Sequence, residues 1–453
     1  MNARELALLA LRNAHDRGAY VQDCLHELLN AHDLSPADRA LATEIASGTV
    51  RHRRTLDRLL DRRLRKPIHQ MAPAVRLVLE SAAYQILFLD RVPDYAVVNE
   101  AVRLAREVAH GRVPGLVNAV LRRLSEMVDR DASAEDVQNV RRILPLPHGG
   151  TIVLKEGLLP EEPDRRLADA YSFPHPLVKR WMQRWGAART EDVLAALNHP
   201  PRTFARINTL RTSADELARR LPESVRDEVR WISNRVADVS HLPHDLLLGL
   251  LDEGLVTIED STAMRAVEAL DLRPGMTVLD LCAAPGGKAS YVAELIRGQG
   301  AVWALDRQGP RLDALRETCR RLHLENVHVA ANVPAEFPDD MPPRFDRVLV
   351  DVPCSNTGVL GRRAEARWRL KDHAMDSLRP LQAELLAQGA GMTAPGGLCV
   401  YSTCSIEPDE NERLVRGFLA DHGEMVLQVE RETLPSADGD GGYFARMVRL
   451  DDA

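Results

Sequence analysis

The chain has 453 residues, which is enough for two or three domains with separate hydrophobic cores. Apolar residues make up 45% and charged residues 28%, as in ordinary soluble proteins, and the net charge of −7 requires local basic surfaces for any nucleic-acid partner. No apolar run is long enough to span a bilayer and the first residues lack the layout of a signal peptide, so we expect a cytoplasmic protein without membrane association. The six cysteines form no C-x-x-C pair and no histidine cluster accompanies them, so neither a disulfide framework nor a metal site is predicted.

Residues 1 to about 130 carry helical periodicity interrupted by short connections. Ser35 has the position of a helix cap, because a proline follows it directly. The same periodicity returns over residues 74–89, 95–110 and 116–127. This pattern predicts a helical bundle.

A strongly basic stretch lies within this bundle. Residues 51–66 hold eight lysines and arginines against two aspartates, a local excess of +6. Four leucines in it form an apolar stripe, so most basic side chains must face outward, where they can contact phosphate oxygens. A solvated helix surface explains the pattern equally well. The nucleic-acid contacts that we predict here are Arg51, Arg53, Arg54 and Arg58.

The next part of the chain changes in character twice. Proline and glycine accumulate over residues 131–170, which is typical of a linker. Residues 171–255 then mix helix and strand signals, with Ser213 as a helix cap, and predict a small α+β subdomain. Trp181 and Trp185 lie four residues apart and hence on one helix face. We interpret them as core residues in preference to groups that stack on bases.

Strand and helix signals alternate from residue 256 to the end. Strands are predicted at 301–306, 327–331, 345–351 and 397–402. Such alternation is typical of an α/β fold with a Rossmann-like, mostly parallel sheet covered by helices on both faces. Ligands of these folds bind outside the carboxyl ends of the strands.

A glycine turn is the first candidate site at those strand ends. A buried strand begins at Thr277 and runs into Pro285-Gly-Gly287, and a helix follows. A glycine turn there lets the backbone approach a ligand closely, and the helix N-terminus offers free N–H groups, so a nucleotide-like cofactor is predicted. The spacing is not G-x-G-x-x-G, which disfavours NAD, and a plain β–α turn is the alternative. The residues predicted to hold the cofactor are Cys282, Ala283, Ala284, Pro285, Gly286, Gly287 and Lys288.

Carboxylates and cysteines end the neighbouring strands. Asp306 is placed to accept hydrogen bonds from ribose hydroxyls, although it could instead cap the segment from Arg307 onward. Cys354 follows the strand that ends at Asp351, and Cys404 follows the last predicted strand. Either cysteine alone is more simply an apolar filler. If the sheet order brings both to one cleft beside Asp351, a cysteine nucleophile is favoured.

These groups suit one reaction in particular, the methylation of a pyrimidine at C5. C5 is a poor nucleophile until a thiolate adds to C6, after which it can attack an electrophilic methyl group. Loss of the C5 proton and elimination of the thiolate then restore the aromatic ring. A carboxylic acid near N3 would offset the charge that develops on the ring.

Three motifs resemble the signature motifs of RNA 5-methylcytosine methyltransferases: Asp280-Leu-Cys-Ala-Ala-Pro-Gly-Gly-Lys288, Asp351-Val-Pro-Cys-Ser-Asn-Thr-Gly358 and Tyr401-Ser-Thr-Cys-Ser-Ile-Glu-Pro-Asp-Glu-Asn-Glu412. The run Val92-Pro-Asp-Tyr-Ala-Val-Val-Asn-Glu100 and the basic stretch resemble a NusB-like RNA-binding domain. Together they resemble the RsmB (Sun/Fmu) class, which modifies a cytosine of small-subunit ribosomal RNA. The resemblance implies S-adenosylmethionine as cofactor and RNA as partner, and we expect a monomer.

The resemblance also implies roles for single residues. Cys404 would be the nucleophile, Cys354 would assist release of the methylated RNA, and Asp351 would contact the cytosine edge beside the cofactor. The turn, Asp306 and Asp351 would hold the cofactor.

Two positions depart from the family pattern. Asn332 stands where an acidic residue usually lies near the adenine, and Glu259 stands where a glutamine is common. Asparagine can still hydrogen-bond an adenine amino group. The Arg206-Ile-Asn208 element, in contrast, matches the family.

The sequence leaves alternatives open. The same fold could methylate tRNA, a protein or a small molecule, or serve as a non-catalytic RNA-binding factor in ribosome assembly. The domain limits that we predict are 1–130 for the NusB-like domain, 131–170 for the linker, 171–255 for the subdomain and 256–453 for the methyltransferase domain.

Overall fold

A computed structural model describes residues 1–109, 111–133, 138–333, 337–370 and 374–451. The chain forms two compact units: unit 1 comprises Met1–Pro200 with Arg362–Arg369, and unit 2 comprises Pro201–Gly361 with Leu370–Ala453. Among the described residues, no helix is both long and apolar enough to cross a membrane.

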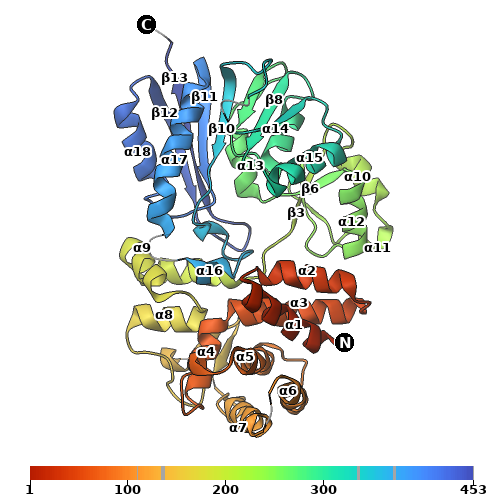
Figure 1. Ribbon diagram of the computed structural model, residues 1–453, viewed down its shortest axis with the longest axis vertical. Coiled ribbons are helices and arrows are strands. Elements are labelled where there is room, and N and C mark those ends of the chain that lie inside the picture. Colours follow the sequence, from red (N-terminus) through yellow and green to blue (C-terminus); the bar gives the residue numbers. More distant parts are fainter. Residues whose placement is uncertain (110, 134–137, 334–336, 371–373, 452–453) are drawn as a thin grey trace. The chain divides into compact units, whose positions relative to one another are not determined.

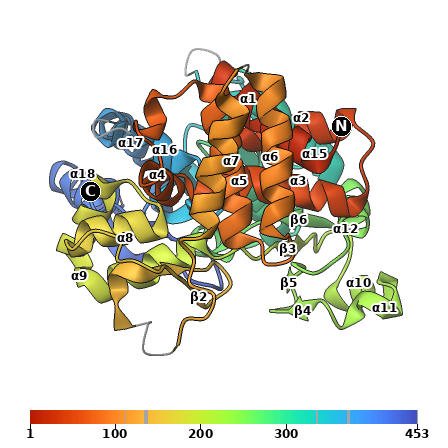
Figure 2. The same ribbon diagram turned by 90° about the horizontal axis from the view of Figure 1, so that it is seen from below.

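The first part of unit 1 is a helical bundle (Figure 2). Its elements are α1 (Ala3–Arg17), α2 (Val21–Ala31), α3 (Pro36–Arg51), α4 (Arg53–Asp61), η1 (Ile68–Gln70), α5 (Pro73–Phe88), α6 (Asp94–Val108) and α7 (Val113–Ser125). The central helix is α5, which is apolar around most of its circumference and packs against α1, α3, α4, α6 and α7. The predicted Ser35 cap is confirmed, since its hydroxyl accepts the Asp38 N–H at 3.1 Å. His110, which the predicted helix over 95–110 includes, lies outside the described residues.

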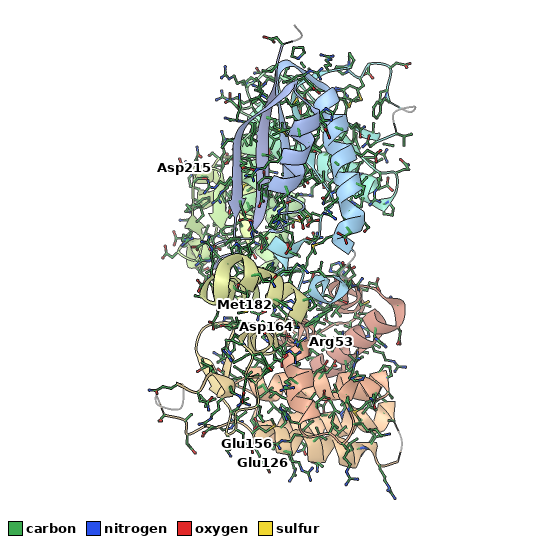
Figure 3. The ribbon with its side chains drawn as sticks, turned by 90° about the vertical axis from the view of Figure 1, so that its left-hand side faces the viewer. Arg53, Glu126, Glu156, Asp164, Met182 and Asp215 are labelled. Carbon is green, nitrogen blue, oxygen red and sulfur yellow. The ribbon has the colours of Figure 1, made fainter. Side chains whose placement is uncertain are left out.

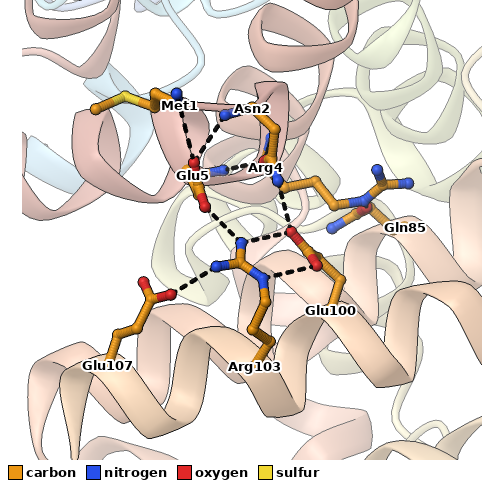
Figure 4. A network of polar contacts seen from close by, with 8 residues as sticks. All are labelled: Met1, Asn2, Arg4, Glu5, Gln85, Glu100, Arg103 and Glu107. Atoms are coloured by element: carbon orange, nitrogen blue, oxygen red, sulfur yellow. Dashed lines mark hydrogen bonds and ion pairs between the residues drawn. The ribbon is translucent and has the colours of Figure 1, made fainter.

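A polar network fixes the first helix to the bundle (Figure 4). Arg103 on α6 binds Glu5 of α1 at 2.6 Å, and Glu100 and Glu107 of its own helix at 2.7 and 2.5 Å. Asn2 caps α1 through the N–H groups of its first turn. The Arg103 side chain is 38% exposed, so each of these pairs contributes at most about 1 kcal/mol.

The segment predicted as a linker contains ordered elements. They are β1 (Ile143–Pro145), its antiparallel partner β2 (Thr151–Val153), and α8 (Pro163–Tyr171). The hairpin forms because Leu144, Ile152 and Leu154 are buried between the prolines and glycines that indicated a linker. The four domain limits given above stay predictions, and residues 134–137 of the linker lie outside the described residues.

The last helices of unit 1 are α9 (His175–Asn198) and α16 (Ala366–Arg369). A kink at Gly186, with φ at 77°, divides α9. Trp181 is 1% exposed and packs against Phe173 and Trp185, so its predicted core position is confirmed.

Unit 2 is built on a seven-stranded sheet (Figure 1). Its strands are β7 (Thr277–Asp280), β8 (Ala301–Asp306), β9 (Val327–Ala331), β10 (Phe345–Asp351), β11 (Thr393–Thr403), β12 (Met425–Thr433) and β13 (Gly442–Arg449). Their order is β12-β13-β11-β10-β7-β8-β9, with β13 antiparallel to both neighbours and the other adjacent pairs parallel. The predicted Rossmann-like α/β fold is therefore confirmed.

Helices cover both faces of this sheet. One face packs in a core with α13 (Ser261–Glu268), α14 (Gly287–Leu295) and α15 (Pro310–Leu322). The other face packs with α17 (Ala374–Gly391) and α18 (Glu412–Asp421). Both cores draw on the central strands, because alternate side chains of a strand point to opposite faces.

A smaller antiparallel sheet precedes the large one within unit 2. Its order is β4-β5-β3-β6, and its elements are β3 (Phe204–Ile207), α10 (Ala214–Arg220), α11 (Glu223–Arg226), β4 (Arg230–Trp231), β5 (Val236–Asp238), α12 (His244–Asp252) and β6 (Val256–Ile258). This is the predicted α+β subdomain, with its own apolar core.

Arg206 on β3 ties this subdomain to the helix that follows the glycine turn. The side chain is fully buried, and its guanidinium pairs with Glu259 at 2.7 Å and with Glu294 of α14. It also donates to the Ser290 hydroxyl at 2.7 Å and to the Gly287 carbonyl at 3.2 Å. The unusual Glu259 is thus one of the two carboxylates that neutralise a buried arginine.

Replacement of Arg206 tests this interaction. Arg206→Ala leaves two buried carboxylates without their cation, so we expect a loss of about 3–5 kcal/mol in the free energy of unfolding of unit 2. Differential scanning calorimetry measures it. Arg220→Ala, which removes an exposed pair with Glu253, is the control and should cost at most about 1 kcal/mol. Equal effects of the two substitutions would contradict the role given to Arg206.

Candidate active site

The candidate site lies at the carboxyl edge of the seven-stranded sheet. The chain passes from β7 to β8 and β9 on one side, while β10 and β11 lie on the other, so β7 and β10 flank a topological switch point. Asp280, Asp306 and Asp351 end β7, β8 and β10, and Cys404 directly follows β11. The sheet order thus brings together the strand ends that the sequence indicated.

The glycine turn between β7 and α14 is shaped for close approach of the backbone. Gly286 has a φ of 110°, and an added Cβ would lie 2.9 Å from a Leu315 methyl and 3.1 Å from Thr318. Only glycine fits this position, because other residues rarely adopt this φ and because a Cβ would be too close to its neighbours. The helix begins at Gly287, so its first N–H groups face the turn.

Asp306 supports the turn from the neighbouring strand. Its carboxylate accepts the Ala284 N–H at 2.9 Å and the Arg307 N–H at 2.7 Å. A helix cap by Asp306, the alternative considered from the sequence, is not present, because α15 begins at Pro310 with Gly309 as its N-cap and without a side-chain cap. Each carboxylate oxygen has more than one acceptor direction, so the ribose contact stays a prediction.

Asp280 carries an ionisable group that the sequence analysis did not assign. The side chain is fully buried, and neither oxygen accepts a well-formed hydrogen bond from a described residue. Burial, and then the nearby Asp351 carboxylate, raise the pKa of Asp280 from its ordinary 3.8 to about 8. A buried carboxylate in this state suits a cationic group of a ligand.

Lys288 and Asp351 form an ion pair inside the site. The Lys288 Nζ lies 2.8 Å from one Asp351 oxygen, and the Ser402 hydroxyl donates to the other at 2.6 Å. Burial lowers the pKa of Lys288, but the Asp351 carboxylate outweighs it and holds the pKa above its ordinary value. Lys288 was predicted as a cofactor contact, and the partner that the structure gives it is Asp351.

Cys354 and Cys404 are in direct contact. Their sulfur atoms lie 3.1 Å apart, and the Cys404 thiol lies 3.1 Å from the Asn356 side-chain oxygen. The hydrogen bond with Cys404, and then burial, raise the pKa of Cys354 well above its usual range. Cys354 is therefore a thiol at neutral pH, and the 3.1 Å contact places it to donate to the Cys404 sulfur.

Glu410 holds the two cysteine loops together. Its fully buried carboxylate accepts the Ser355 N–H at 2.9 Å and the hydroxyls of Ser355 and Ser405, each at 2.5 Å. Gln382 donates to it at 3.0 Å. Each serine directly follows one of the two cysteines. The sequence analysis included Glu410 in a motif but gave it no role, because the spacing does not reveal its contact with Ser355, which is 55 residues away.

The remaining cysteines are Cys24, Cys319 and Cys399, which lie away from the pair, and Cys282, which lies in the glycine turn. Burial raises the pKa of Cys319 to about 11 and that of Cys399 to about 12. Burial likewise raises the pKa of Cys282 and of Cys24. Thiols in this state are poor nucleophiles at neutral pH.

Asn332 lies beside the end of β8. Its N–H donates to the Asp306 carbonyl at 2.8 Å, and its side-chain oxygen accepts from Gln388 at 2.9 Å. The adenine contact predicted for Asn332 has not been tested and stays a prediction.

Most of the arginines predicted to bind nucleic acid are engaged within unit 1. Arg54 lies 2.6 Å from an Asp169 oxygen and Arg58 lies 3.5 Å from the other, while Arg51 donates to the Asn198 carbonyl at 3.2 Å. Arg53, labelled in Figure 3, is half-buried on α4. The RNA role of these four side chains stays a prediction, and the intramolecular partners of Arg54 and Arg58 weigh against it.

Comparisons with known proteins identify the class first. A solved structure titled as a methyltransferase homolog from Pyrococcus horikoshii is 25% identical, covers 63% of this chain and 98% of its own, and has a TM-score of 0.54. The crystal structure of PH0851 shares the fold over 99% of both chains, with a TM-score of 0.76 and 23% identity. The fold is thus that of the S-adenosylmethionine-dependent methyltransferases.

The sequence comparisons then identify the family. Family models match the chain as 16S rRNA methyltransferase RsmB/F over residues 267–443, as the NusB family over 1–126, and as an RsmF/B-like ferredoxin-like domain over 173–227. A probable ribosomal RNA small subunit methyltransferase B of Synechocystis is 34% identical over 96% of this chain and 93% of its own. The chain belongs to the RsmB/F family of RNA methyltransferases.

The protonation of Asp280 can be tested through stability. Because the pKa of Asp280 is raised in the folded chain, its contribution to stability is complete below about pH 4 and is lost as the pH rises to about 8. Asp280→Asn keeps the neutral form. We expect the variant to be more stable than the wild type by a few kcal/mol near pH 8, since one pKa unit corresponds to about 1.4 kcal/mol.

Urea unfolding of both proteins between pH 4 and 9 measures this difference. Asp313→Asn, at an exposed position on α15, is the control and should show no such trend. A difference between Asp280→Asn and wild type that does not change with pH would contradict the raised pKa.

Proposed function

We propose that this chain transfers a methyl group from S-adenosylmethionine to C5 of a cytosine in small-subunit (16S) ribosomal RNA. The observation that carries the proposal is the pair of sulfur atoms of Cys354 and Cys404, 3.1 Å apart at the sheet edge that bears the glycine turn. Two thiols with different tasks suit an attack on C6 followed by release.

The residues at the switch point suit S-adenosylmethionine. Both oxygens of Asp280 are buried and accept no well-formed hydrogen bond from the residues that the structure describes, and the turn at Gly286 has no room for a side chain. Both features fit a ligand that is cationic and lies against the backbone. Asp280 would bind a positive group of the cofactor, the turn would lie along its length, and Asp306 would bind its ribose. When bound, the cofactor supplies an electrophilic methyl group.

The two cysteines would divide the chemistry on the RNA. The Cys404 thiolate adds to C6 of the cytosine, and the electron pair gained by the ring makes C5 nucleophilic. After C5 is methylated, its proton is lost to a base, the Cys404–C6 bond breaks, and the ring regains its aromaticity. Cys354, in contact with the Cys404 sulfur, is placed to assist this release and to move a proton at its Sγ.

Asp351 would bind the edge of the cytosine. Its carboxylate is held by the Lys288 ammonium and the Ser402 hydroxyl, which fix both oxygens. To offset the negative charge that addition brings to the ring near N3, Asp351 would have to take up a proton from its pair with Lys288 and donate it there as a carboxylic acid.

The names of relatives support ribosomal RNA as the substrate. The Synechocystis relative and one from Bacillus subtilis, 30% identical over 95% of this chain, both bear the name of small subunit methyltransferase B. The NusB match over residues 1–126 supports an RNA partner. A tRNA substrate and a non-catalytic role in ribosome assembly are the competing hypotheses.

A labelling experiment discriminates among them. The purified chain, S-adenosylmethionine with a labelled methyl group, and either 16S rRNA or tRNA are incubated, and nucleosides are analysed by mass spectrometry. We expect label in 5-methylcytidine from 16S rRNA only. Label only in tRNA would favour the competing enzyme hypothesis, and no label in either RNA or in the small ribosomal subunit would refute methyl transfer. Bisulfite sequencing of RNA from a deletion strain identifies the nucleotide.

Cysteine variants test the division of roles. Cys404→Ala should lose activity and form no covalent RNA adduct, because it removes the proposed nucleophile. Cys354→Ala should still attack but release slowly, so an adduct should accumulate as a retarded band on a denaturing gel. Cys319→Ala, at a buried position on α15, serves as the control and should turn over normally. Full activity in Cys404→Ala would show that the nucleophile is assigned wrongly.

A further inference from the structure

Glu410 lies within unit 2, in the connection between β11 and α18 that also carries Cys404. Its backbone is anchored to the sheet, because the hydroxyl of the fully buried Tyr401 donates to the Glu410 carbonyl at 2.7 Å. The Glu410 side chain is fully buried as well. A buried carboxylate needs hydrogen-bond donors, since burial of an unpaired charge is costly.

The donors around Glu410 divide evenly between its two oxygens. Oε1 accepts the Ser355 N–H at 2.9 Å and a Gln382 side-chain N–H at 3.0 Å. Oε2 accepts the hydroxyls of Ser355 and Ser405. A carboxylate accepts at both oxygens and donates at neither, so it matches both pairs of donors without conflict. An amide in its place would present its own N–H groups to one of the two pairs.

This arrangement holds Cys354 from both sides. Ser355, which follows it, is bound to Glu410 through its N–H and through its hydroxyl. Pro353, which precedes it, accepts a hydrogen bond at its carbonyl from the same Gln382 amide at 2.8 Å. The backbone on either side of the Cys354 sulfur is thereby fixed.

Cys404 is held through the residue that follows it. The Ser405 hydroxyl donates to the same Glu410 oxygen as the Ser355 hydroxyl, and the two serine oxygens lie 3.1 Å apart. Each serine is the direct neighbour of one cysteine, so the distance between the serines bears on the distance between the sulfurs, which is also 3.1 Å. One carboxylate thus controls how closely the two cysteine loops approach each other.

We propose that Glu410 is a positioning residue for the thiol pair, which its carboxylate keeps in contact by binding both serines. The inference rests on the proposed function, in which Cys354 assists the release of methylated RNA from Cys404. Without this link the two loops separate more often, and Cys354 loses its contact with the Cys404 sulfur. Attack by Cys404 itself does not require that contact. Loss of Glu410 therefore slows release more than attack.

Disulfide formation measures the contact in the full chain without any RNA. Diamide takes up the two thiol hydrogens as the bond between Cys354 and Cys404 forms, and peptide mass spectrometry under non-reducing conditions follows the rate. Glu410→Asp keeps the charge but is one carbon shorter and cannot reach both loops, so we expect the rate to fall about tenfold. Glu410→Gln keeps the reach, and the serine hydroxyls can rotate to accept from its amide, so we expect a fall of only about two- to threefold.

The reaction with RNA tests the role in release. Glu410→Asp should accumulate the covalent adduct on a denaturing gel and lower kcat about tenfold, while the Kd for S-adenosylhomocysteine stays unchanged. In the Cys354→Ala background, which already accumulates the adduct, Glu410→Asp should add nothing, because its effect passes through Cys354. A merely structural contribution of Glu410 would impair both backgrounds alike, and that result would overturn the proposal.

Asp409→Asn is the matched control, since Asp409 directly precedes Glu410, is exposed and pairs with Arg413 at 2.8 Å. It should alter neither the disulfide rate nor release. An unchanged disulfide rate in Glu410→Asp, or a larger fall in Glu410→Gln than in Glu410→Asp, would overturn the proposal. If Glu410→Asp fails to fold, as judged by circular dichroism, Ser405→Ala decides. It removes one link to Glu410 and should slow disulfide formation about two- to threefold, and an unchanged rate overturns the proposal.

The two proposals fail separately. If the wild-type chain methylates no RNA, the proposed function is wrong, and the disulfide rates still decide whether Glu410 keeps the two sulfurs in contact. If methylation is observed but Glu410→Asp behaves as wild type, only the positioning role is wrong.

Discussion

The buried arginine on the first strand of the subdomain is the interaction on which the cofactor turn depends. Arg206 is fully buried and reaches Glu259, Glu294 and the Gly287 carbonyl at once. Gly287 is the first residue of α14, so the cation of the subdomain is bonded to the start of the helix that shapes the turn. A buried cation with two carboxylates is costly to dismantle, because removal of any member leaves a charge in an apolar environment. This explains why the subdomain is an integral part of unit 2.

Hydrogen bonds and ion pairs between residues at the ends of different strands fix the reactive groups of the site. Asp351 is fixed by Lys288 and Ser402, and Glu410 joins the loops that carry Cys354 and Cys404. Groups fixed in this way need little rearrangement when charge develops nearby, which is the condition for electrostatic catalysis. Asp280 is the exception, since its burial without a partner destabilises the folded chain above its ordinary pKa. The same feature makes the position available to a cationic ligand.

The sequence predicted those elements that are buried on both faces or begin at a clear cap. The strands expected at 301–306, 327–331 and 345–351 are β8, β9 and β10 with the same limits, since continuous apolar runs mark central parallel strands. It did not reveal β12 and β13, because β12 at the sheet edge carries charged side chains that weaken the strand signal. Nor did it predict the hairpin of β1 and β2, whose prolines and glycines suggested a linker.

The sequence predicted which residues gather at the candidate site better than it predicted which side chains bind one another there. The glycine turn, Asp306, Asp351 and both cysteines meet at one edge, as the motif positions implied. The partners of Lys288, Arg54 and Arg367 could not be found from spacing, because each lies more than 60 residues away in the chain. The sequence of a basic stretch does not distinguish arginines that bind phosphates from arginines that bind an aspartate such as Asp169. Ion pairs between residues far apart in the chain therefore determine which arginines could still contact RNA.

The charge balance of the site bears on product release under the proposed reaction. Asp280, Asp306 and Asp351 bring three carboxyl groups to the switch point, and Lys288 neutralises Asp351. Arg311 lies 3.7 Å from Asp306, and the raised pKa keeps Asp280 protonated up to about pH 8, so a cationic ligand would gain attraction from Asp280 only as this group loses its proton. Methyl transfer converts a sulfonium into a neutral thioether, so the ligand loses a positive charge while the protein keeps its carboxyl groups. Under the proposed reaction, the site would therefore favour the cationic form of the cofactor over its neutral product.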